Sequence, residues 1–296
     1  DTARPGPTSP SGARADGVLE LAAQQGYQIL SRASTMDLFG VRNGVPGRVT
    51  GGGGFEPWAA VDVVVADLAV SLDGDTVAVI DDSRTVLLTG PMRGELTEVP
   101  VPYTNLRSPQ FVLGTLWLVG DDADGVPRLF TVDRVGSVAE VELTLPGSAR
   151  VDQYAVSPAR ARIALLLSTG GERSLGIGTI TSSGSMAVVD WHPLPIVAAS
   201  GTTLDGVSAV AWHAETAIAM AALDTGVRSV YAAEVDGSLV EELGPFSGEV
   251  EELTAVARLG GGAIALRTDA GVTWRYEART RWTRLGEGLS AIAYAG

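Results

Sequence analysis

The chain has 296 residues, 45% of them hydrophobic, with 37 Gly and 15 Pro, a composition typical of a folded protein with many turns. Its 35 acidic residues outnumber the 21 basic ones, all of which are Arg, and the net charge of -14 argues against nucleic acid as a partner. Cys is absent, which excludes disulfides, thiol catalysis and Cys-ligated metal, and no stretch approaches the roughly 20 consecutive apolar residues that cross a bilayer.

The first 16 residues differ in composition from the rest of the chain. Residues 1–16 contain three Pro and few apolar side chains, which predicts a linker. We assign residues 17–296 to one β-propeller domain, on the evidence of the repeats described below. Within it, only GVLELAAQQ (17–25) could form a short helix, because no long segment has apolar residues at helical spacing.

From residue 65 onward, a short apolar strand flanked by turn residues recurs along the chain. Its copies begin 42, 44, 56, 46 and 36 residues apart, close to the roughly 40–50 residues of a four-stranded propeller blade. The six copies are VADLAV (65–70), RSPQFV (107–112), VDQYAV (151–156), VSAVAW (207–212), LTAVAR (253–258) and LSAIAY (289–294).

Most copies lead into the same succession of elements. After VADLAV, a tight turn precedes a second apolar strand (76–80), a polar loop precedes a third (85–89), and a Gly-bearing turn precedes a fourth (95–100). Continuous apolar runs are typical of strands buried on both faces, whereas strands that meet water alternate. The pattern predicts an all-β fold, a six-bladed β-propeller.

The two ends of the chain predict how the ring closes. Residues 27–50 hold only three expected strands, YQILSR, MDLFGVR and GRVT, and we interpret GGGG (51–54) as a connection between blades. The last copy, LSAIAY (289–294), has no strand after it. We therefore expect this C-terminal strand to enter the first blade as its innermost strand, which leaves no unpaired inner edge.

Longer stretches add a family resemblance. The chain contains, in order, VADLAVSLDGDTVAVIDDSRTVLLTG, NLRSPQF followed by LWLV, YAVSPARARIALLL, VSAVAWH and TWRYEARTRWTRLGEG. Together they resemble the propeller domain of the LpqB lipoproteins of GC-rich Gram-positive bacteria, over roughly residues 27–296. The turns SLDG (71–74) and SPAR (157–160) depart from the SPDG of that family.

The resemblance implies a membrane-anchored, extracytoplasmic lipoprotein without catalytic residues. It also implies that the domain binds the extracellular part of a sensor histidine kinase, MtrB, and modulates the MtrAB two-component system. Because the chain has no lipobox Cys, we expect it to be one domain of a longer protein, which reaches the membrane only through an anchor absent from this chain.

Polar loops between the second and third strands of several blades end in Arg. In a propeller these loops share a face with the connections between blades, so we expect their charges to form a ring, and Arg is enriched at protein interfaces. The alternative is that each Arg pairs locally with an acid, worth only about 0–1 kcal/mol at an exposed site. The candidate partner-binding residues are Arg84, Arg128, Arg173, Arg228, Asp81, Asp82, Asp121, Asp122 and Asp224.

The longest connection between blades, HPLPIVAASGTTL (192–204), is expected on the same face. It carries Leu194, Ile196 and Val197, which would mark a contact site if they face solvent. Packing of these side chains back onto the blade is the alternative. Leu194 and Ile196 complete the set of candidate partner-binding residues.

Two other classes of function deserve comparison. A propeller hydrolase or lactonase would need a divalent cation in the central channel, with ligands drawn from Asp62, Asp152, Asp205, Glu251, Glu252 and Glu287. Such sites also use Asn, which occurs only at 43 and 105, and the two His, His192 and His213, are too few for a His-rich site. Asp121, Asp122 and Asp124 resemble a Ca²⁺ loop, but Val132 stands where the bidentate Glu belongs. We therefore expect no metal, cofactor or catalytic residue.

A cell-wall glycan-binding module would instead present exposed aromatic side chains. Trp58, Trp274 and Trp282 are the candidates, although packing on the outer strands accounts for them equally well.

Overall fold

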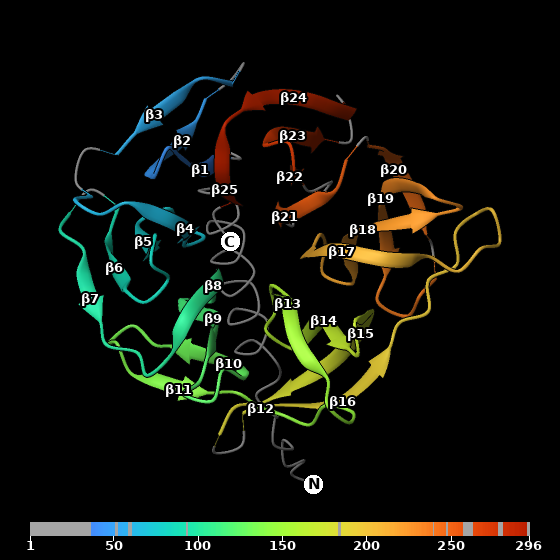
Figure 1. Cartoon of the computed structure of the whole chain (residues 1–296), viewed down its shortest axis with the longest axis horizontal. Helices are drawn as coiled ribbons and strands as arrows, with labels where there is room; N and C mark the ends of the chain where they lie inside the picture. Colours follow the sequence, from blue (N-terminus) through green and yellow to red (C-terminus); the bar gives the residue numbers. More distant parts are fainter. Residues whose placement is uncertain are drawn as a thin grey trace, which may run out of the picture. The chain divides into compact units, whose positions relative to one another are not determined.

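A computed structural model describes residues 37–50, 53–58, 61–92, 94–182, 185–238, 240–246, 248–256, 263–277 and 281–294. Within these ranges the elements of secondary structure are 25 β-strands, and no helix is long and apolar enough to span a bilayer. The strands form six separate sheets, arranged in a ring with one inner strand of each sheet toward the centre (Figure 1). The fold is the predicted six-bladed β-propeller.

The sheets follow one another along the chain. The first contains β25 (Leu289–Tyr294), β1 (Leu38–Arg42), β2 (Val45–Val49) and β3 (Phe55–Pro57). The second contains β4 (Val65–Val70), β5 (Thr76–Asp81), β6 (Leu87–Pro91) and β7 (Thr97–Val99). The third contains β8 (Thr104–Val112), β9 (Thr115–Asp121), β10 (Pro127–Val132) and β11 (Val138–Glu140).

The remaining three sheets have the same order from the centre outward. The fourth contains β13 (Arg150–Val156), β14 (Arg162–Thr169), β15 (Glu172–Thr181), β16 (Ala187–Pro193) and β12 (Glu142–Leu143). The fifth contains β17 (Asp205–Trp212), β18 (Ala217–Asp224), β19 (Val227–Glu234) and β20 (Glu241–Pro245). The sixth contains β21 (Val250–Val256), β22 (Ala263–Thr268), β23 (Val272–Glu277) and β24 (Arg281–Glu287).

Ring closure occurs as the sequence predicts. The last strand, β25, pairs antiparallel with β1, with Leu38 opposite Tyr294 and Arg42 opposite Leu289. The first blade therefore combines strands from the two ends of the propeller, and its innermost strand is the C-terminal one. Separating these ends would expose the edge of β1.

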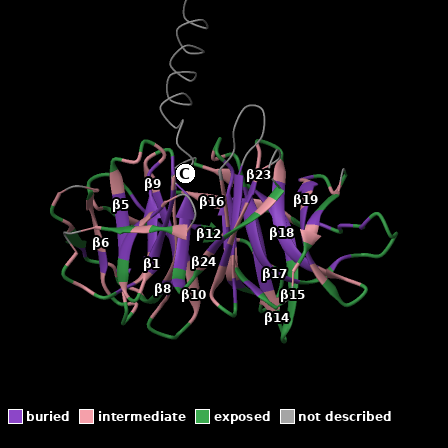
Figure 2. Cartoon of the chain, turned by 90° about the horizontal axis from the view of Figure 1, so that it is seen from above, coloured by how far each residue is buried: buried purple, intermediate pink, exposed green. Residues whose placement is uncertain are grey.

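The core lies between neighbouring blades rather than at the centre of the ring. The second strands are buried along most of their length, as are several of the inner strands (purple in Figure 2). Between the second and third blades, for example, Ala78 and Ile80 of β5 share one apolar cluster with Leu116 and Leu118 of β9. Burial on both faces explains why these strands are continuous apolar runs in the sequence.

Three details of the first and fourth blades differ from the sequence interpretation. The hairpin between β1 and β2 turns at Asn43 and Gly44, both at positive φ, so that β2 begins two residues earlier than GRVT. Gly53 and Gly54 lie between β2 and β3 of one blade, so the assignment of 51–54 to a connection between blades is wrong. The parallel pairing of β12 with β16, which extends the fourth sheet, is a feature that the repeat pattern does not contain.

Two predictions fall outside the described residues. These are the strand YQILSR (27–32) and the short helix at 17–25. The boundary between linker and propeller at residue 17 likewise stays a prediction.

Candidate functional site: the mouth of the central channel

The propeller has two faces, which we name for the loops they carry. The connection face carries the connections between blades and the turns between the second and third strands, and every inner strand begins there. The opposite face carries the turns between first and second and between third and fourth strands. Residues proposed from the sequence as a recognition surface belong to the connection face.

All six inner strands are irregular near the connection face. Register shifts separate Val65 from Asp67 in β4 and Val250 from Glu252 in β21, and comparable shifts occur in β8, β13, β17 and along the pairing of β25. A bulge adds a residue to one strand and redirects the side chains beside it. Polar side chains such as Asp67 and Glu252 directly follow these shifts, and both line the channel.

These strands enclose a cavity of about 380 Å³ at the centre of the ring, to which all six contribute. We call its charged part the channel mouth. The charged lining residues are Asp67, Arg84, Arg107, Asp152, Glu251, Glu252 and Arg267.

Asp67 is held in place by backbone amides from two blades. Its Oδ1 accepts a hydrogen bond from Leu68 N at 2.8 Å, and its Oδ2 accepts one from Ser108 N at 3.0 Å. The carbonyl of Ser108 accepts a bond from the buried hydroxyl of Tyr154 at 2.7 Å, which links a third blade. Burial raises the pKa of Asp67, an effect that the positive charge of Arg84 opposes.

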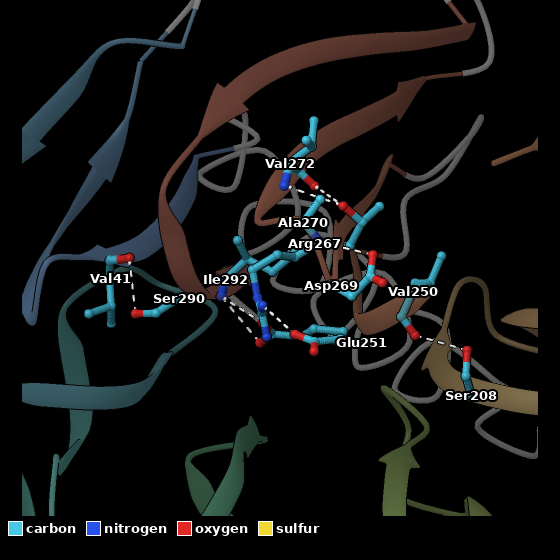
Figure 3. Close-up of polar contacts among 12 residues, drawn as sticks. Val41, Ser208, Val250, Glu251, Arg267, Asp269, Ala270, Val272, Ser290 and Ile292 are labelled. Carbon is cyan, nitrogen blue, oxygen red and sulfur yellow. Dashed lines mark hydrogen bonds and ion pairs between the residues drawn. The ribbon is translucent and has the colours of Figure 1, made fainter. Parts of the chain in front are cut away.

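Glu252 occupies the corresponding position on β21. Both of its carboxylate oxygens lie 3.2 Å from Ile292 N on β25, and Oε2 also accepts a bond from Arg267 Nε at 3.1 Å. In Figure 3, Ile292 and Arg267 lie close together, and Glu251 is bonded to the Arg267 guanidinium. Burial, followed by the negative charge of Asp67, raises the pKa of Glu252 to about 7, although Arg267 counteracts both.

The charges of the channel mouth do not balance. Arg107 pairs with Asp121 at 2.9 Å and Arg173 pairs with Asp152 at 3.1 Å, so each of these carboxylates has its own cation. Arg267 instead forms ion pairs with two carboxylates, those of Glu251, at 2.6 Å, and Glu252, at 3.1 Å.

Arg84 stands apart from these pairs. Its Nη1 donates to the carbonyl of Leu106 at 3.0 Å, and no carboxylate of the described residues lies within 4.0 Å of it. Its backbone is held at φ 57° by bonds to Asp81 O and from Leu106 N. The lining residues comprise four carboxylates, Asp67, Asp152, Glu251 and Glu252, and three guanidinium groups, Arg84, Arg107 and Arg267, an excess of one negative charge.

The Arg residues proposed as a ring bind separate partners instead. Arg128 bonds Asp122 at 2.8 Å and lies 3.5 Å from Glu140, on the outer part of its blade. Arg228 is 4.0 Å from Glu249. The structure thus agrees with local pairing for Arg128, Arg173 and Arg228, and does not join the four Arg into one network.

Some of the proposed Asp side chains accept hydrogen bonds from backbone amides of the turns in which they lie. Asp81 accepts bonds from the amides of Thr85 and Val86, and Asp122 accepts one from Val126 N at 2.9 Å. Asp224 accepts a bond from the hydroxyl of Ser200 at 3.0 Å. Asp82 is exposed on the connection face.

Of the two alternatives for Leu194 and Ile196, the structure agrees with packing and not with exposure to solvent. Both are buried, because the connection packs into the apolar cluster between the fourth and fifth blades, which includes Leu175 and Trp212. Leu194 N donates to Leu175 O of the fourth blade, and Leu204 N donates to Ile196 O within the connection. Only Val197 of the three stays exposed, at 48%.

The acidic residues considered for a central cation do not all lie in the channel. Of the acids considered for a central cation, Asp152, Glu251 and Glu252 line the cavity, while Asp62 and Asp205 do not. Glu287 pairs with Arg284 on the outermost strand of its blade. Among the residues that the structure describes, no three His, Asp or Glu side chains are grouped to hold a metal ion.

The three Trp residues considered for glycan stacking are partly buried. Trp58 packs against Phe39, and Trp282 packs edge-on against Phe246, which also contacts Trp274. These contacts fit the packing alternative.

Sequence reasoning missed Asp67, Arg107 and Arg267 as parts of a site. A signal for Asp67 exists, because a carboxylate in the middle of VADLAV interrupts an otherwise apolar inner strand. Arg267 likewise follows the apolar run AIAL in β22, one residue before that strand ends. Nothing in their spacing shows that they meet.

A family model described as the lipoprotein LpqB β-propeller domain matches residues 53–292. The chain belongs to the LpqB β-propeller family. A curated relative, lipoprotein LpqB of Cutibacterium acnes, is 27% identical over 218 residues, which cover 72% of this chain and 36% of the relative. The chain thus spans about a third of the length of that LpqB protein, and the family resemblance found in the sequence is confirmed.

Solved structures agree on the fold of this LpqB propeller. TolB from Acinetobacter baumannii is similar with a TM-score of 0.63 at 14% identity, covering 88% of this chain and 66% of that one. A chain of the nidogen/laminin complex gives a TM-score of 0.56 at 12% identity, covering 88% of this chain and 98% of that one. At such identities the similarity concerns the fold alone.

Proposed function

We propose that this LpqB propeller is a non-enzymatic protein-interaction domain of a membrane-anchored lipoprotein on the extracytoplasmic side of the membrane. Its partner in this proposal is the extracellular part of an MtrB-like sensor histidine kinase, through which it modulates the MtrAB two-component system. The observation that carries the proposal is the family match over residues 53–292.

The connection face is the surface that we propose for recognition. It combines exposed charged turns with a channel mouth built from all six blades, so that one partner segment could contact several blades at once. Charged groups at the rim of an interface act mainly on the rate of encounter, and salt screens them over about 8 Å at physiological ionic strength.

Charge reversal on the two faces tests this proposal. In the double variant Arg128→Glu/Arg173→Glu, both side chains are more than 40% exposed on the connection face. The matched control, Arg134→Glu/Arg162→Glu, changes the net charge equally at exposed positions of the opposite face. Association with the immobilised extracellular segment of the kinase is measured by interferometry at several salt concentrations.

Only the first variant should associate more slowly, by about tenfold at low salt, and the difference should shrink as salt is raised. Equal binding by both variants and the parent protein would show that the connection face is not used. The absence of any binding by the parent protein would overturn the choice of partner.

A further inference from the structure

The channel mouth holds two carboxylates that face the same cavity from different blades. Asp67 and Glu252 both line the cavity, and each is held by at least one backbone amide, with Arg267 as a further partner of Glu252. Because these amides do not move with the side chains, the carboxylates are positioned before any ligand arrives. Such prior organisation reduces the entropic cost of binding.

The cations already present leave one of these charges uncompensated. Arg84 acts on Asp67, whereas Arg267 divides its bonds between Glu251 and Glu252. A further cation beside Glu252, whose side chain is 24% exposed, would neutralise the remaining charge, and an ion pair is stronger there than between fully exposed groups.

The cavity has room for that cation and leaves it polar partners. Its volume of about 380 Å³ is within the range of small-molecule sites, roughly 300–1,000 Å³, and is ample for one long side chain. Each carboxylate oxygen of Asp67 has one bond from the protein, so each keeps a lone pair for a donor on the ligand. A guanidinium or ammonium group carries several donors and no acceptor.

We propose that the channel mouth binds a basic side chain, Arg or Lys, which a partner protein inserts into the cavity between Asp67 and Glu252. The identity of that partner rests on the proposed function, but the site itself does not. The excess carboxylate favours a cation, and a cavity of about 380 Å³ has room for a long side chain, whereas the described residues offer no grouped ligands for a metal ion.

Proton binding should compete with this ligand. The ionisable groups around Glu252 are Glu251 on its own strand, Arg267 on β22 and Asp67 on β4, while β25 contributes the amide of Ile292. Farther along the same lining, β13 adds Asp152, which is paired with Arg173, and the buried Tyr154. Because burial raises the pKa of Glu252 to about 7, the cation should bind about tenfold more weakly at pH 6 than at pH 8.

The test uses small probes and the propeller alone. ¹⁵N-labelled protein is titrated with N-acetyl-arginine amide and, separately, with N-acetyl-citrulline amide, which has the same shape without the charge. We expect saturable shifts of the Ile292 amide with the arginine probe, at millimolar concentrations, and a response to citrulline at least tenfold weaker. The response should weaken at pH 6.

Two variants locate the effect. Glu252→Gln removes the excess charge and should reduce the arginine response at least tenfold. Asp124→Asn removes one charge from an exposed turn of the same face and should leave the response unchanged. The comparison of the two probes needs only the parent protein, so it stands even if the first variant does not fold.

Equal responses to the two probes, or an arginine response that persists in a folded Glu252→Gln variant, would overturn the proposed cation site. These results are distinguishable from failure of the proposed function. If the parent protein binds the kinase segment without any arginine response, the cation site is wrong and the function stands. If arginine binds as expected and the kinase segment does not, the site stands and the partner is wrong.

Discussion

Glu252 holds the amide of Ile292 through both carboxylate oxygens, each at 3.2 Å, and so joins the inner strand of the sixth blade to the strand that closes the first. The two ends of the propeller meet where β25 pairs with β1, so Glu252 holds the strand that makes the closure. The stability of the closure and the charge of the channel mouth therefore depend on the same side chain.

This relationship predicts how stability varies with pH. Folding raises the pKa of Glu252 from 4.5 to about 7, so the folded state binds its proton more tightly than the unfolded state does. The resulting stabilisation is complete below about pH 4.5 and is lost as the pH rises through 7. The variant Glu252→Gln, which cannot ionise, should therefore gain stability relative to the parent protein between pH 5 and pH 8, by up to about 3 kcal/mol. Urea unfolding at both pH values measures the difference, and a difference independent of pH would contradict the expectation.

The closure itself predicts the effect of a truncation. Removing residues 289–296 should leave the first blade without its innermost strand and expose the edge of β1, so that thermal unfolding becomes broader and begins at lower temperature. Circular dichroism at a β-sheet wavelength follows the transition. Removal of the predicted linker, residues 1–16, serves as the control and should leave the melting curve unchanged. A truncated protein that melts like the parent would show that β25 is dispensable.

Two neighbouring residues of the long connection should respond differently to truncation. Ile196 is 3% exposed and packs in the cluster of the fourth and fifth blades, so Ile196→Ala should cost about 2–4 kcal/mol of unfolding free energy. Val197 is 48% exposed, and Val197→Ala should cost less than about 0.5 kcal/mol. Equal losses in chemical denaturation would mean that the connection does not fold back as described.

The pair of hydrogen bonds between Gln110 and the backbone of Val156 links the third blade to the fourth. Gln110 Nε2 donates to Val156 O at 3.3 Å, and Gln110 Oε1 accepts from Val156 N at 3.0 Å. Gln110→Leu should leave both backbone groups unpaired and cost about 1–3 kcal/mol. Gln153→Leu, which loses a single bond of 3.3 Å to Glu251 O, should cost less. The order of the two unfolding free energies checks this assignment.

The sequence by itself determined the architecture. Strands packed between neighbouring blades must be apolar on both faces, so copies such as VADLAV and LSAIAY recur at the spacing of a blade, and the incomplete first blade predicts closure by the last strand. It also showed the family, because long stretches of several blades resemble the LpqB propeller even though two turns depart from its pattern.

Only the tertiary structure decided which side chains share a site. Asp67 and Glu252 come from the second and sixth blades, and the bulges that turn them into one cavity leave no periodic trace in the sequence. Likewise, Ile196 is buried because its connection packs against the fourth and fifth blades, where a backbone hydrogen bond from Leu194 N to Leu175 O holds it. The sequence alone was compatible with either a buried or an exposed Ile196. The periodicity of a sequence shows which side chains of a strand share a face. The lining of a channel between six strands depends instead on how those strands are placed relative to one another, and that arrangement exists only once the ring has closed.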